Sequence, residues 1–147
     1  MEIERRRFYA GEASQITGIP YRTIDHWART GLLTPSISEA RGSGRSRLYS
    51  FKDVLSLRVI RDLREKGIPA QALRKVIKLL RRTGMDSHLD EVQLLVIGKD
   101  VAIVNNTREI ESVLSAPGQL YLTPALIFDL RKPIAEVRRE VARLRVA

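Results

Sequence analysis

The sequence contains no cysteine, and this absence excludes several classes of function at once. Thiolate zinc sites, thiolate sensing of metals, disulfide frameworks and cysteine nucleophiles all need a residue that the chain lacks. The chain also has no run of about 18 apolar residues that could span a membrane, and residues 1–7 lack the apolar stretch of a signal peptide. We therefore expect a cytoplasmic protein that contacts no membrane.

Acidic residues are scarce relative to basic ones, which indicates an acidic partner. The 147 residues include 26 Lys and Arg against 17 Asp and Glu, a formal charge of +9. The apolar content of 44% is typical of a packed protein rather than of a disordered basic tail. A chain of this length forms one ordinary domain or two small ones.

The excess positive charge is confined to the first part of the chain. Residues 1–83 carry 18 basic against 8 acidic residues, whereas residues 84–147 carry 8 against 9. A concentrated positive field attracts phosphates. The asymmetry predicts a polyanion-binding domain over residues 1–83 and a second domain with another task over residues 84–147.

The first part has the pattern of four helices and one hairpin. Apolar residues at helical spacing, with glycine or proline at the boundaries, predict helices over residues 10–17, 20–30, 51–66 and 70–82. Residues 34–50 have β-prone ends around a segment rich in glycine and arginine, which is typical of a hairpin, or wing, with a basic tip. The basic side of the fourth helix is most simply a solvated face.

The second part mixes strands and helices. Two β-rich runs at residues 92–97 and 101–104 flank Gly98-Lys99-Asp100, the pattern of a hairpin. A short helix, another strand and a final helix are expected at residues 108–115, 120–128 and 133–146. The predicted fold class is therefore mainly α with small β elements, the second domain being a small α/β (α+β) unit.

The helix over residues 20–30 has an apolar and a basic face. Its apolar arc holds Tyr21, Ile24, Trp27 and Ala28. Its far side carries Arg22, His26 and Arg29. A helix fits the major groove of DNA, where arginine can grip a guanine or a phosphate and Thr23 can add a hydroxyl contact. An ordinary surface helix with solvated charges is the alternative.

The tip of the hairpin adds a second basic element. Arg41, Arg45 and Arg47 fall within seven residues, interleaved with glycine and serine. Such a tip can follow a sugar-phosphate backbone or enter a minor groove. A merely soluble loop is the alternative, but a position directly after a candidate recognition helix favours contact with nucleic acid.

Four short motifs follow one another in the order of a known family. They are Arg22-Thr23-Ile24 in the second helix, Gly31-Leu32-Leu33 after it, Arg47-Leu48-Tyr49 at the end of the wing, and Gly67-Ile68 after the third helix. Through them, residues 8–35 and 46–77 resemble the MerR family of bacterial transcription regulators. The resemblance implies a winged helix-turn-helix domain over residues 1–83.

The resemblance also implies a function and the residues that perform it. A sequence-specific transcription regulator would bind an inverted-repeat operator in double-stranded DNA as a homodimer, with RNA polymerase at the promoter as a further partner, and would be nucleoid-associated. The resemblance assigns DNA-binding roles to Arg22, His26, Arg47 and Tyr49, and the basic patterns described above add Thr23, Arg29, Arg41 and Arg45. The chain departs from the family pattern at Asp25, where an arginine is usual, and at His26-Trp27, where two tyrosines are usual.

The last helix offers candidate dimer contacts. Ile134, Val137, Val141 and Leu144 recur at spacings of three, four and three, which is typical of a coiled-coil seam. Because a seam of about two heptads is too short to stand alone, it would have to dock on the rest of its domain. Packing of this stripe on the chain's own sheet is the alternative, and the pattern favours neither.

Two other classes of function compete with a regulator. An architectural DNA-binding protein, excisionase-like or nucleoid-associated, would use the same winged fold. An enzyme is not expected, because the sequence shows no phosphate loop, metal-ligand set or nucleophile with its base. We therefore predict no catalytic residue, no metal site and no cofactor. The 64 residues of the second part could bind a small apolar molecule between sheet and helix, bind a protein or only dimerise, and any effector is unidentified.

Overall fold

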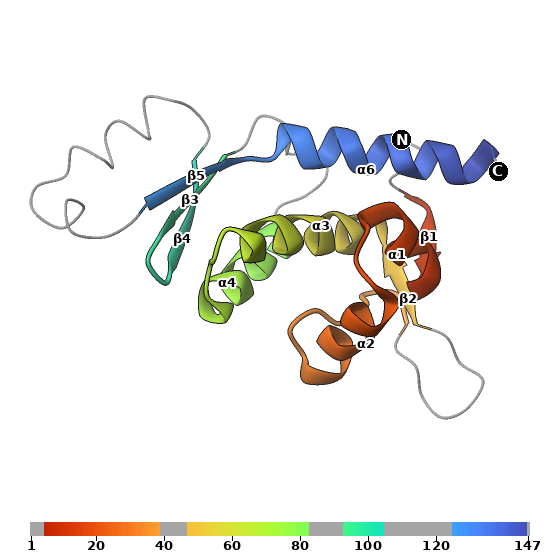
Figure 1. Ribbon diagram of the computed structural model, residues 1–147, viewed down its shortest axis with the longest axis horizontal. Helices are drawn as coiled ribbons and strands as arrows, with labels where there is room; N and C mark the ends of the chain where they lie inside the picture. Colours follow the sequence, from red (N-terminus) through yellow and green to blue (C-terminus); the bar gives the residue numbers. More distant parts are fainter. Residues whose placement is uncertain (1–4, 39–46, 83–92, 105–124, 147) are drawn as a thin grey trace, which may run out of the picture. The chain divides into compact units, whose positions relative to one another are not determined.

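The computed structural model describes residues 5–38, 47–82, 93–104 and 125–146 (Figure 1). They belong to two compact units: unit 1 lies within Met1–Asp62 and Pro133–Ala147, and unit 2 within Leu63–Lys132. In this division the last helix groups with the N-terminal elements, and the fourth helix groups with the sheet. The predicted boundary at residue 83 falls outside the described residues.

Unit 1 begins with a helix-turn-helix, as predicted. Helix α1 (Ala10–Thr17) ends at Gly18, whose φ of 75° lies in the left-handed region that favours glycine. Pro20 is the N-cap of α2 (Tyr21–Thr30). The apolar residues Ile16, Ile24 and Trp27 are at most 4% exposed, so the two helices share one core.

The wing pairs with strand β1 (Arg7–Tyr9), which the sequence pattern did not predict. Strand β2 (Leu48–Ser50) of the wing runs antiparallel to β1, and Phe8 lies opposite Tyr49. Ser38 forms an isolated bridge with Leu48, so the two arms of the predicted hairpin meet. Three residues are too few for the two-residue period of a strand to stand out. The basic tip, residues 39–46, lies outside the described residues.

Helix α3 (Phe51–Glu65) starts directly after β2, and Ser50 and Asp53 cap its first turn. The backbone amide of Asp53 donates to Ser50 Oγ, and the amide of Ser50 donates to Asp53 Oδ2, both at 3.0 Å. Asp53 is only 2% exposed and also accepts hydrogen bonds from Ser36 N and Oγ, both at 2.7 Å. This carboxylate therefore ties both arms of the wing to α3.

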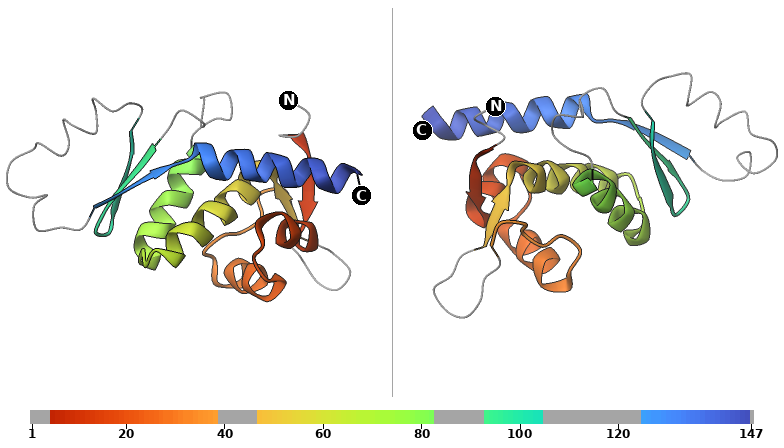
Figure 2. Two further views of the ribbon diagram at one scale, coloured as in Figure 1. Left: turned by 45° about the horizontal axis from the view of Figure 1, so that its top comes forward. Right: turned by 180° about the vertical axis from the view of Figure 1, so that it is seen from behind.

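The apolar stripe of α6 (Arg131–Val146) is covered by the chain itself. Ile134, Val137 and Val141 are at most 1% exposed, and Leu144 is half-buried. Arg58 of α3 donates a hydrogen bond to Glu136, and α6 runs beside α3 in every view (Figures 1 and 2). The first three residues of the expected dimer seam are thus already buried within one chain.

Unit 2 combines α4 (Ala70–Arg82) with a three-stranded antiparallel sheet. The central strand β3 (Gln93–Ile97) lies between β4 (Asp100–Val104) and β5 (Ala125–Asp129). Helix α4 buries Ala72, Leu73, Val76, Ile77 and Leu80. The predicted fold class, mainly α with small β elements, is confirmed, while the helix expected at residues 108–115 lies outside the described residues. None of the described helices combines the length and apolar character that crossing a membrane requires.

Tyr49 lies in the core of unit 1, which corrects its expected role as a DNA contact. Its side chain is 0% exposed, and its hydroxyl has no hydrogen-bond partner among the described residues. Burial raises the pKa of Tyr49 to about 12, so the phenol is neutral at physiological pH. Tyr49 therefore supports the wing by packing and does not reach its surface.

We expect Tyr49→Phe to leave the free energy of unfolding unchanged or to raise it by about 1 kcal/mol, because it removes a buried hydroxyl without a described partner. Urea unfolding followed by circular dichroism measures this change. The affinity for duplex DNA should stay within about twofold of that of the parent protein, because the buried side chain of Tyr49 does not reach the DNA-binding face. A large loss of DNA affinity with unchanged stability would contradict the buried, supporting role.

Candidate nucleic-acid interface

Helix α2 turns its predicted DNA-contacting side chains outward. Arg22, His26 and Arg29 are exposed, whereas Ile24 and Trp27 are 0% and 4% exposed. The buried pair anchors one side of the helix in the core, so the basic side faces away from it. This is the arrangement by which a helix-turn-helix presents a recognition helix to the major groove.

Thr23 and the N-terminal turn of α2 add hydrogen-bonding groups beside these cations. Thr23 is half-exposed, and its backbone amide donates to Pro20 O at 2.9 Å. Tyr21 was expected in the apolar arc, but its side chain is 54% exposed. The helix begins at Tyr21, so the apolar arc has no preceding turn to cover this ring. A tyrosine hydroxyl at this position can contact sugar or phosphate. The helical wheel did not indicate this role, because it placed Tyr21 on the apolar side.

Asp25 connects α2 to the wing. One of its carboxylate oxygens accepts a hydrogen bond from Arg47 at the end of the wing, and the other lies 3.0 Å from Arg29 Nε. The side chains of Arg47 and Asp25 are only 19% and 21% exposed, so this ion pair is shielded from solvent more than a surface pair is. Arg47 is therefore held beside α2 with a defined orientation. We call Asp25, Arg29 and Arg47 the carboxylate clamp.

The carboxylate clamp leaves this face of unit 1 positive. One carboxylate lies between two guanidinium groups, which leaves a surplus of one charge. Arg22 and His26 have no acidic partner among the described residues. Unpaired donors on an exposed helix are available to phosphate oxygens or to base edges. The face can thus bind a polyanion and can also read its sequence.

The remaining predicted contacts are not placed by the structure. Arg41 and Arg45 belong to the tip of the wing, outside the described residues, so Arg47 represents the wing at this site. Within the described part of the chain, no three His, Asp or Glu side chains come together in a group that could hold a metal ion.

Comparison with known proteins gives the family. The family described as MerR HTH family regulatory protein matches residues 8–80. An uncharacterized HTH-type transcriptional regulator of Mycobacterium tuberculosis (strain H37Rv) is 41% identical over 102 residues, which cover 69% of this chain and 45% of that protein. Nodulation protein NolA of Bradyrhizobium elkanii is 36% identical over 99 residues, covering 63% of this chain and 42% of NolA. The HTH-type transcriptional regulator HmrR of Sinorhizobium medicae is 30% identical over 110 residues, covering 71% of this chain and 73% of HmrR.

The matched region contains the parts from which the interface is built. Residues 8–80 include α1, α2, the wing, α3 and nearly all of α4. The chain spans less than half the length of the Mycobacterium tuberculosis protein and of NolA, but it covers most of HmrR. With the helix-turn-helix, the wing and these matches together, the chain belongs to the MerR family of helix-turn-helix regulatory proteins.

Proposed function

We propose that this protein regulates transcription by binding double-stranded DNA sequence-specifically, as a homodimer on an inverted repeat. The exposed face of α2 carries the proposal: Arg22 and His26 point away from the core, and the clamp holds Arg47 beside them. A helix of 10 residues with such a face fits the major groove. The names of the relatives, HTH-type transcriptional regulators, support the same function.

The cations divide into two proposed roles. Arg22 is unpaired among the described residues and lies in the first turn of α2, so it is assigned to a base edge, where a guanidinium can bind guanine with two hydrogen bonds. Arg29 and Arg47 are already oriented by Asp25 and are assigned to phosphates, which fix the position of the protein on the duplex. The imidazole N–H of His26, on the same exposed face, is assigned to a further phosphate.

A homodimer follows from the small reach of one recognition helix. A single α2 reads one half-site, and two-fold related copies read two half-sites about 34 Å apart on one side of the duplex. Ile134, Val137 and Val141 are buried within their own chain, so the contact between copies uses other surfaces. RNA polymerase at the promoter is the further partner that a regulator of this kind would meet.

Selection of bound sequences from a random duplex pool tests the proposal directly. We expect the full chain to enrich one palindromic sequence and to bind it about 10³-fold more tightly than random duplex at moderate salt. Equal affinity for all sequences would instead favour an architectural DNA-binding protein. Enrichment of a single half-site without its repeat would contradict the homodimer while leaving sequence-specific binding intact.

Arg22→Ala tests the assignment of a base contact to α2. We expect the affinity for the selected sequence to fall by about 1–3 kcal/mol, with much less change for random duplex, because a base contact acts only on the correct sequence. Arg139→Ala is the matched control, because Arg139 is an exposed arginine of α6 and does not belong to the exposed face of α2. Fluorescence anisotropy with labelled duplexes measures both variants. Equal losses in the two would show that Arg22 contributes only charge.

Asp25→Asn tests the clamp. Loss of this carboxylate raises the net charge and releases Arg47, so we expect random duplex to bind more tightly and the ratio of specific to random affinity to fall about fivefold. Asp62→Asn is a close control: Asp62 also lies near two arginines, Arg58 at 3.3 Å and Arg61 at 3.1 Å, and its side chain is 20% exposed. Both variants change the charge equally. A parallel change in the two would therefore refute a positioning role for Asp25.

A further inference from the structure

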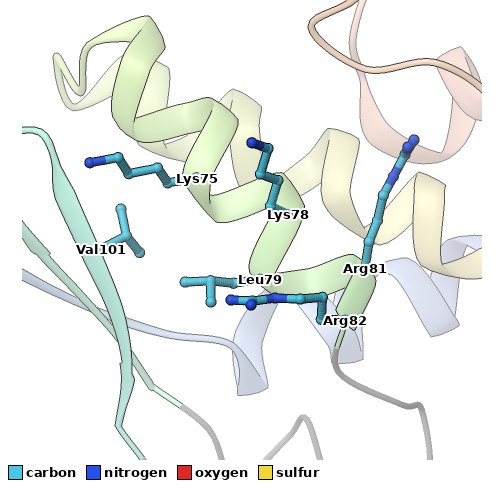
Figure 3. A pocket seen from close by; sticks show the side chains of 6 residues that line it. All are labelled: Lys75, Lys78, Leu79, Arg81, Arg82 and Val101. Carbon is cyan, nitrogen blue, oxygen red and sulfur yellow. The ribbon is translucent and has the colours of Figure 1, made fainter.

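Unit 2 contains a basic cleft between α4 and β4 (Figure 3). Its volume is about 450 Å³, within the range of sites that hold small organic ligands. The cleft is lined by Lys75, Lys78, Leu79, Arg81, Arg82 and Val101. None of these residues belongs to the face of α2 described above, so the cleft requires its own explanation.

The cleft combines an apolar wall with a basic rim. Leu79 and Val101 are half-buried, and Lys75, Leu79 and Arg82 extend from α4 toward the strand that carries Val101 (Figure 3). Lysine and arginine add aliphatic stems to this wall and carry their charges at the ends of those stems. The basic side of α4 was expected to be a solvated face. Strand β4 changes that expectation, because it packs near the helix and leaves a hollow between them.

The charges at the rim are mostly positive. Lys75 Nζ lies 2.7 Å from Asp100 Oδ1, and this hydrogen bond lowers the pKa of Asp100 below its ordinary value. The two side chains are 48% and 85% exposed, so the pair is solvated and easily exchanged for another anion. Lys78 and Arg82 have no acidic partner among the described residues. An anionic ligand can therefore bind these cations without breaking a buried ion pair.

We propose that this cleft binds a small amphipathic organic anion, with an apolar body against Leu79 and Val101 and a carboxylate or phosphate head at Arg82 on the basic rim. Neutral apolar molecules would leave the cations without partners, and inorganic anions would leave the apolar wall without contact. Duplex DNA fits less well, because its outer surface is phosphate and sugar and has no apolar body to cover Leu79 and Val101. The ligand class thus follows from the wall and the rim together.

Decanoate is a suitable probe, because it has a flexible apolar chain and one carboxylate. We expect isothermal titration of the full chain to show one decanoate site per chain, with decanol and inorganic phosphate each binding at least about tenfold more weakly. If decanol bound as tightly as decanoate, the cations would contribute nothing to binding. If phosphate bound as tightly as decanoate, the apolar wall would contribute nothing. Either result would overturn the proposal.

Arg82→Gln locates the bound head group. We expect it to weaken decanoate binding about fivefold or more, whereas Arg74→Gln should have less than about a twofold effect. Arg74 is the matched control, because it is also an exposed arginine of α4 but does not line the cleft. Equal effects of the two variants would show that decanoate responds only to the overall charge, which would refute the site.

Val101→Phe tests the apolar wall without changing any charge. The larger ring should fill the cleft and abolish decanoate binding, provided that thermal unfolding shows a folded protein; otherwise Arg82→Gln against Arg74→Gln decides. If the unsubstituted chain binds no decanoate, and Arg82→Gln but not Arg74→Gln weakens duplex DNA binding, the cleft is a phosphate-contacting surface and the proposal is wrong. Substitutions on α2 should leave decanoate binding unchanged, so this test is independent of the proposed function.

Discussion

The buried carboxylate of Asp53 is the constraint on which the interface of unit 1 depends. A buried charge is costly unless hydrogen bonds satisfy it, and Asp53 receives them from Ser36 and Ser50, on the two arms of the wing. Both arms are thereby fixed to the first turn of α3. Arg47 lies three residues before Ser50, so the base of the wing is already positioned when Arg47 meets Asp25. The buried hydrogen bonds of Asp53 therefore help to position Arg47 at the interface.

Local signals were sufficient for the helices, and contacts between distant residues account for what the sequence did not reveal. Gly18, Pro20 and the Ser50 cap act within one helical turn, so α1, α2 and α3 begin and end within about two residues of their predicted bounds. The outward cations of α2 followed from the same periodicity. The bond from Arg47 to Asp25 spans 22 residues and has no local pattern. Tyr49 is buried through its pairing with β1, which is equally invisible to a helical or strand period.

The apolar stripe of α6 shows the same limit in another form. A spacing of three and four identifies which residues of a helix are apolar, but it does not identify the surface that covers them. The sequence therefore left two partners open for Ile134, Val137 and Val141, a second copy or the sheet. The structure buries all three within a single chain, and α6 groups with the N-terminal elements. Net charge does not identify contacts either: the basic helix α4 groups with the sheet, whose strands lie in the nearly neutral residues 84–147.

The two basic surfaces differ in what surrounds their charges, and this difference separates the ligands proposed for them. Helix α2 presents basic side chains on an exposed face, for which we propose the groove of a duplex, and Asp25 orients Arg47 and Arg29 while neutralising part of their charge. Electrostatic attraction to phosphates acts on every sequence alike, so under the proposed function a carboxylate at this position would lower the affinity for random duplex more than it lowers sequence recognition. Helix α4 presents its cations around a hollow with an apolar wall. Such a site gains from desolvating an apolar ligand, which a phosphate backbone cannot supply.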